Sequence, residues 1–101
     1  MRLTPAQVGM ALLLGASGAP PLSSGDLKAD IRRGRGWLVS LAGGQDFGYD
    51  AMSWHEFLWS TGAGGYRWGR RSADKWARHV RAGMGRPGWA EAVRELEAEG
   101  E

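Results

Sequence analysis

The chain has 101 residues, of which 43% are hydrophobic and 24% charged, and it carries a formal net charge of +2. A chain of this length forms one domain with a small core. Cysteine is absent, which excludes disulfides, thiolate metal sites and cysteine nucleophiles. No apolar run approaches the roughly 20 residues that a membrane span needs. We therefore expect a single domain over residues 1–101 that does not associate with a membrane.

The chain is rich in tryptophan and glycine, with six tryptophans and seventeen glycines. A buried aromatic side chain removes roughly 150–250 Å² from water, so a few of them can anchor a small core. Each glycine adds backbone entropy that folding must overcome. The composition predicts short elements that are joined by glycine-rich turns.

The first predicted helix begins after Thr4. Thr4 can cap the helix, Pro5 suits the first helical position, and Gln7 completes a reciprocal capping box. Together with Arg2, the apolar run over residues 8–14 also loosely resembles a secretion signal. Because the run is short and only one charge precedes it, we favour a structural helix and expect a cytoplasmic protein.

The second helical region follows a pair of prolines. Ser23 or Ser24 can cap it. The segment Arg-Arg-Gly-Arg-Gly over residues 32–36 is expected to weaken the helix, because glycine is a poor helix former. The apolar pattern over residues 37–41 fits a helix or a short strand, and we prefer the helix.

The third predicted helix follows the turn that begins at Gly43. Asp50 is the candidate N-cap. Behind it, three apolar residues share one helical stripe: Trp54, Phe57 and Leu58. This pattern is typical of a helix that packs on a core.

Two further helices complete the chain. A loop over residues 61–69 leads to a helix that Ser72 is expected to cap. The Trp76 side of this helix is expected to face the core. Pro87 is expected to open the last helix. The acidic end of the chain is expected to fray from about residue 97, since glutamates there meet the negative end of the helix dipole. The fold class that we predict is all-α, a compact bundle of about five short helices joined by glycine-rich loops.

Acidic residues and a histidine gather around the third helix, and such residues can form a metal or catalytic site. Asp46, Asp50 and Glu56 could supply oxygens to a hard cation, but Gly48 does not stand where an EF-hand loop needs its glycine. Asp46 more simply fixes the turn through its own backbone. No second histidine follows His55 at the spacing of zinc proteases. We therefore predict no metal, no cofactor and no catalysis.

Charge is distributed unevenly along the chain. Residues 27–88 contain eleven lysines or arginines and five acids, whereas residues 89–101 contain one arginine and five glutamates. A basic body with an acidic tail indicates interactions with charged partners.

One segment, over about residues 38–58, resembles the helical hairpins of bacterial HEAT-repeat proteins. The residues that carry this resemblance are Leu38, Leu41, the turn GQDFGYD over 44–50, Trp54, Phe57 and Leu58. The resemblance implies a hairpin in which Phe47 and Tyr49 plug the turn and Asp50 caps the second helix. It also implies contact with another protein rather than catalysis.

The function that we expect is that of a non-enzymatic interaction module, most simply one that binds another protein as an adaptor, an inhibitor or an assembly subunit. Arginine and tryptophan are over-represented at binding hot spots. The residues expected to be exposed and to bind the partner are Tyr66, Arg67, Trp68, Arg70, Arg71, Lys75 and Arg78. The alternative is a nucleic-acid-binding protein that uses the arginine-rich segments 32–36 and 66–81, because arginines among aromatic and glycine residues suit phosphates and stacked bases.

Overall fold

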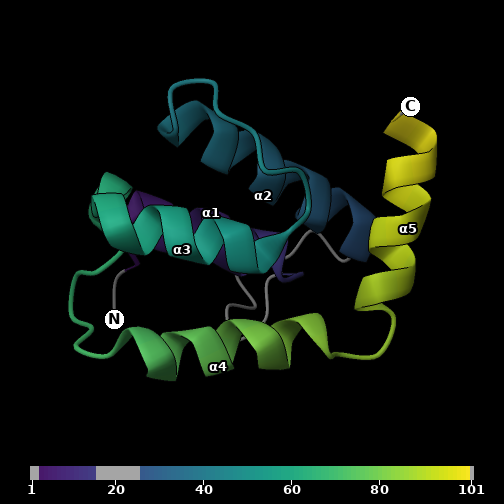
Figure 1. The fold of residues 1–101 in the computed structure, drawn as a ribbon. Helices are drawn as coiled ribbons and strands as arrows, with labels where there is room; N and C mark the ends of the chain where they lie inside the picture. Colours follow the sequence, from purple (N-terminus) through teal and green to yellow (C-terminus); the bar gives the residue numbers. More distant parts are fainter. Residues whose placement is uncertain (1–2, 16–25, 101) are drawn as a thin grey trace.

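The computed structural model describes residues 3–15 and 26–100. Within these ranges the chain forms five α-helices, one short 3₁₀ helix and no strand, which confirms the predicted all-α fold (Figure 1). The helices are α1 (Pro5–Leu13), α2 (Leu27–Leu41), α3 (Ala51–Thr61), α4 (Ala73–Met84) and α5 (Trp89–Gly100), and the 3₁₀ helix is η2 (Ala63–Gly65).

The predicted caps explain where three of the helices begin. Thr4 and Gln7 form the reciprocal capping box at the start of α1. Asp50 accepts a hydrogen bond from the Ser53 amide at 3.1 Å, and Ser72 accepts one from the Lys75 amide at 3.2 Å. Each cap pairs an amide that the helix itself leaves without a partner.

The start of α2 differs from the prediction. Its N-cap is Asp26, whose carboxylate accepts a hydrogen bond from the Ala29 amide at 3.2 Å. Ser23 and Ser24, the predicted caps, lie outside the described residues. Aspartate caps a helix as well as serine does, and its charge also favours the positive end of the helix dipole.

Helix α2 runs without interruption through the Arg-Gly segment, so the expected weakening at residues 32–36 is wrong and the strand alternative for 37–41 is excluded. Gly34 is buried against α1, and a Cβ atom there would overlap the backbone of Leu13. On α1, Gly9 faces α2, and a Cβ atom added at Gly9 would lie 2.7 Å from a methyl group of Leu38. The glycines let the two helices approach closely, and this contact offsets their low helix propensity.

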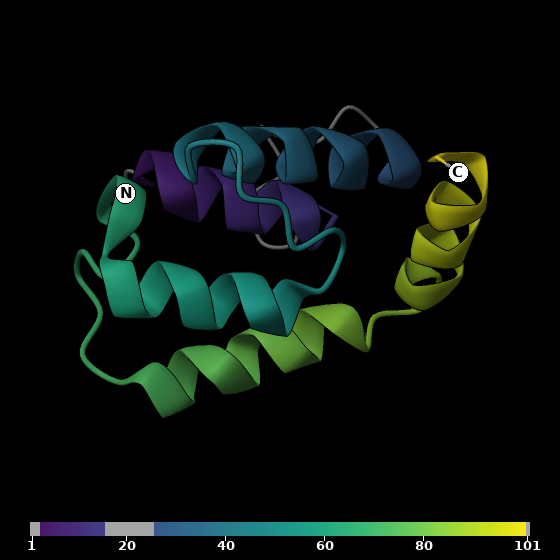
Figure 2. The same ribbon diagram turned by 45° about the horizontal axis from the view of Figure 1, so that its top comes forward.

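The other helices are arranged around the α1–α2 pair. Helix α1 packs along α2 and also touches α3, α4 packs against α3, and α5 packs against the start of α2 (Figures 1 and 2). Among the described residues, Trp54 and Tyr66 are the largest fully buried side chains. One core therefore joins residues from all five helices.

The turn between α2 and α3 uses its acids for structure. Asp46 accepts a hydrogen bond from the Gly48 amide at 2.7 Å, as predicted, and also receives two from the Arg35 guanidinium at 3.1 and 2.8 Å. Phe47 packs edge-on against Trp54, with ring centroids 4.9 Å apart. The Arg35 guanidinium holds the pKa of the Asp46 carboxyl below its usual range.

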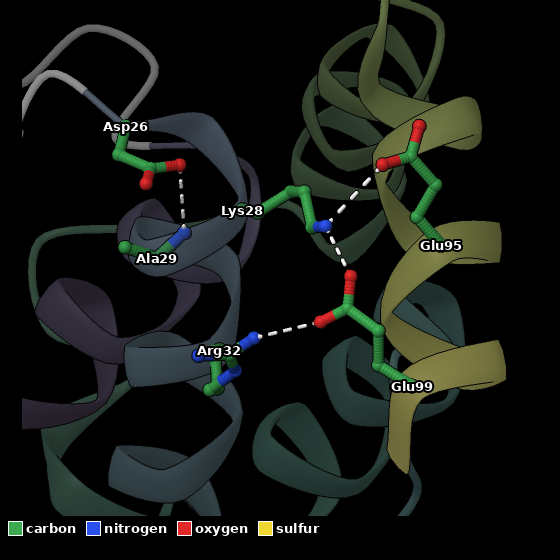
Figure 3. Close-up of polar contacts among 6 residues, drawn as sticks. All are labelled: Asp26, Lys28, Ala29, Arg32, Glu95 and Glu99. Atoms are coloured by element: carbon green, nitrogen blue, oxygen red, sulfur yellow. Dashed lines mark hydrogen bonds and ion pairs between the residues drawn. The ribbon is translucent and has the colours of Figure 1, made fainter. Parts of the chain in front are cut away.

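Helix α5 begins at Trp89, two residues after Pro87, which lies in the preceding turn and does not open the helix as predicted. The Trp89 indole donates a hydrogen bond to the Leu13 carbonyl at 3.0 Å. The helix extends to Gly100, and its Glu99 pairs with Lys28 and Arg32 of α2 (Figure 3). This acidic helix thus covers one basic part of α2.

Candidate partner-binding site

The seven residues predicted to bind a partner lie on the loop that follows η2 and on α4. Five of them are exposed: Arg67, Trp68, Arg71, Lys75 and Arg78. Trp68 stands out, since 65% of its surface is accessible, the largest exposure among the described large hydrophobic residues. An exposed tryptophan beside arginines is the composition expected of a binding hot spot.

Tyr66 is fully buried, so the expectation that it would be exposed on this loop is wrong. Its hydroxyl lies 2.8 Å from Nδ1 of His55, which pairs both polar groups inside the core. Its ring packs edge-on against Trp59, with centroids 6.2 Å apart. Burial raises the pKa of Tyr66 to about 12, so its phenol is neutral at neutral pH. Its buried side chain anchors the start of the loop in the core.

The first turn of α1 ties this loop to the rest of the molecule. The Gln7 side-chain amide donates to the Tyr66 carbonyl at 3.2 Å and to the Trp68 carbonyl at 2.9 Å. Thr4 donates its hydroxyl proton to the Gly65 carbonyl at 3.0 Å. Thr4 and Gln7 therefore cap α1 and also hold, through these hydrogen bonds, the loop on which Trp68 is exposed.

Arg70 is half-buried and lies between two aromatic rings. Its guanidinium carbon is 3.4 Å from the ring centroid of Trp76 and 5.3 Å from that of Tyr66. One of its N–H groups points to the Tyr66 carbonyl at 3.5 Å. Burial lowers the pKa of Arg70, but an arginine stays protonated at neutral pH. The guanidinium is thus held in place by stacking, and most of its five N–H donors have no acceptor within the part of the chain that the structure describes.

A pocket of about 190 Å³ opens beside Arg70, between α1 and α4. Its lining residues are Leu3, Gln7, Met10, Ala11, Leu14, Tyr66, Arg70, Trp76, His79 and Val80. The α1 side of the pocket was not predicted from the sequence, and the prediction that the Trp76 side of α4 faces the core is only partly met. Trp76 is only half-buried and packs against His79, with ring centroids 4.9 Å apart. Its neighbours Lys75 and Arg78, on the same helix, indicated that this side is near the surface.

Ten of the basic residues lie in two groups, four on α2 and six in the segment 66–81. Those of α2 are paired: Lys28 and Arg32 with the α5 glutamates, Arg33 with Asp30, and Arg35 with Asp46. In the segment 66–81, by contrast, no basic residue forms an ion pair with any carboxylate that the structure describes. These six residues, with Trp68 and Trp76, are called the α4 face below: Arg67, Arg70, Arg71, Lys75, Arg78 and Arg81.

Comparisons with protein-family models, with curated proteins and with solved structures find no match to this chain. None of the described helices is both long and apolar enough to cross a lipid bilayer. Across residues 3–15 and 26–100, no three histidine, aspartate or glutamate side chains converge in a way that could hold a metal ion.

Proposed function

We propose that this protein is a non-enzymatic interaction module that binds an acidic surface of another protein through the α4 face. The observation that carries the proposal is the contrast between the two basic groups. The cations of α2 are neutralised by ion pairs within the chain, whereas the segment 66–81 holds six cations against the single acid Asp74. Unpaired cations around exposed and half-exposed tryptophans attract an anionic partner and give it apolar surface to bury.

Nucleic acid is the second candidate, and one observation favours it. Trp68 is exposed between Arg67 and Arg70, an arrangement on which a base could stack. Two observations favour a protein instead. The other arginine-rich segment, 32–36, is already engaged in ion pairs. The pocket beside Arg70 is lined mainly by apolar side chains, which suit an apolar side chain better than a phosphodiester backbone.

Affinity capture from the source cell, with and without nuclease, tests the proposal. The baits are the unmodified protein, Arg78→Glu on the α4 face, and Arg94→Glu, a matched charge reversal at an exposed position of α5. We expect a protein partner that survives nuclease, is lost with Arg78→Glu and is retained with Arg94→Glu.

Two results would argue against this function. Loss of all captured material after nuclease would support the nucleic-acid candidate. Equal loss with Arg78→Glu and Arg94→Glu would mean that net charge alone, rather than the α4 face, attracts the captured protein.

A further inference from the structure

The pocket between α1 and α4 has the size of one side chain. Sites for drug-sized ligands measure about 300–1,000 Å³, whereas this pocket measures about 190 Å³. Met10, Leu14 and Val80 are buried and give it an apolar lining. A cavity of this size and lining fits a single large apolar group, not a whole cofactor or nucleotide.

The rim of the pocket provides positive charge at a fixed position. Arg70 is part of the lining, and Trp76, against which its guanidinium is stacked, lies next to it. No carboxylate among the described residues pairs with Arg70. A stacked guanidinium loses little rotamer entropy when it binds a carboxylate, and its planar fork matches a carboxylate in two hydrogen bonds.

A second hollow lies on α4 and shares two lining residues with the first. It is lined by Lys75, Trp76, Arg78 and His79. Trp76 and His79 therefore belong to both hollows, and two further cations flank the second one. An extended segment that placed an apolar side chain in the first hollow would carry its neighbouring residues over these cations.

We propose that the α4 face recognises a short acidic peptide segment whose central large apolar side chain fills the α1–α4 pocket and whose flanking carboxylates bind Arg70, Lys75 and Arg78. This inference rests on the proposed function and narrows it, because it names the kind of segment that the partner presents. The α1 side of the pocket, with Met10 and Ala11, becomes part of the binding site.

A peptide series on the unmodified protein provides the test. The probes are fluorescein-labelled heptapeptides with three glutamates on each side of a central alanine, leucine, phenylalanine or tryptophan, and fluorescence anisotropy measures their binding. We expect the phenylalanine peptide to bind about tenfold more tightly than the alanine peptide, the gain expected from burial of one large apolar side chain. A labelled single-stranded oligothymidylate is the nucleic-acid probe.

Two matched variants locate the binding. Ala11→Phe places a phenyl ring in the pocket, whereas Ala82→Phe places the same ring at an exposed position of α4 outside it. The preference for phenylalanine over alanine should vanish in Ala11→Phe and persist in Ala82→Phe. Arg70→Gln should weaken all four peptides by a similar factor, because the carboxylates are common to them.

The outcomes separate this inference from the proposed function. Equal, salt-sensitive binding of the four peptides would overturn the pocket inference and leave the acidic-partner proposal standing. Binding of none of the peptides at low salt would overturn both. Tighter binding of the oligothymidylate than of every peptide would overturn both in favour of nucleic acid, and an unchanged phenylalanine preference in Ala11→Phe would place the apolar anchor elsewhere.

Discussion

His55 and Tyr66 show how single residues of this chain acquire a role that their sequence neighbours do not reveal. Both are polar, both are buried, and they form a hydrogen bond with each other at 2.8 Å. The sequence showed no zinc-protease spacing after His55, and it did not indicate the partner of His55, which is eleven residues away across a loop. A buried polar group needs such a partner, because an unpaired one carries its full cost of desolvation.

Replacement of the tyrosine hydroxyl tests this pair. Tyr66→Phe keeps the ring but leaves Nδ1 of His55 without its partner, so we expect the free energy of unfolding to fall by about 1–3 kcal/mol. Equilibrium denaturation measures the change. A variant as stable as the parent protein would show that the hydrogen bond is not formed in solution.

Stability should also depend on pH through His55. Burial lowers the pKa of His55 below its ordinary value of 6.5, although a hydrogen bond with the Ala73 backbone and the charge of Glu56 oppose the shift. Arg70 and Arg81 reinforce it. Because the unfolded chain then binds a proton more readily than the folded one, stability is fully present above the unfolded pKa and declines as the pH falls below about 6.5.

The measurement is denaturant unfolding as a function of pH, with two histidine variants. His79 also has a lowered pKa, caused by packing against its neighbours and by the nearby Arg70. We expect the decline on acidification to be smaller in His55→Gln and in His79→Gln than in the parent protein. A decline between pH 7 and pH 5.5 that neither substitution reduces would assign the effect to other groups.

At the level of the helices, the close contact between α1 and α2 determines which glycine of α2 the packing requires. Gly34 faces the backbone of α1, whereas an added Cβ at Gly36 meets no atom within 4 Å. The sequence showed two glycines within one arginine-rich segment and predicted a weakened helix there. It could not show which glycine lies at the crossing, because the crossing depends on how a second helix packs.

Alanine substitutions at the two glycines should have opposite effects. Gly34→Ala should destabilise the fold by about 1–3 kcal/mol or more, since overpacking at a tight crossing forces the backbones apart. Gly36→Ala should stabilise it by about 0.5–1 kcal/mol, because alanine loses less backbone entropy in a helix. Thermal unfolding of the two variants measures the difference, and equal effects would contradict the crossing.

Helix α5 is attached by apolar packing and by ion pairs, and we expect the two to contribute unequally to the free energy of unfolding. Leu96 is almost fully buried, whereas Lys28 and Glu99 pair at the surface (Figure 3). Leu96→Ala should lower the free energy of unfolding by about 2–5 kcal/mol, and Glu99→Gln should have a much smaller effect that disappears in high salt. If Glu99→Gln were the more destabilising variant, the ion pairs and not the core would attach α5.

Across the whole molecule, features that depend on residues close in sequence could be predicted, whereas features that depend on tertiary packing could not. Caps such as Thr4, Asp50 and Ser72 act within one turn of helix, so spacing alone identified them. The pairing of Lys28 with Glu99, 71 residues away, depends on tertiary packing and was not predictable in this way. The local resemblance of residues 38–58 to HEAT-repeat hairpins stays a prediction.

The candidate site shows the same difference between features that could be predicted locally and features that depend on tertiary packing. The cations and Trp68 of the α4 face were named from composition and spacing, and five of the seven named residues are exposed. The pocket was missed because its lining comes from α1, from α4 and from the loop before α4. The neutralisation of the α2 arginines was missed because it needs the folded turn and α5.

An amide chemical-shift map of the protein, recorded during titration with its captured partner, tests whether the α4 face is the binding surface. We expect shifts confined to the loop that carries Trp68, to α4 and to the α1 residues that line the pocket, with α2 and α5 unperturbed. Shifts concentrated on α2 and α5, with the α4 face silent, would contradict this expectation.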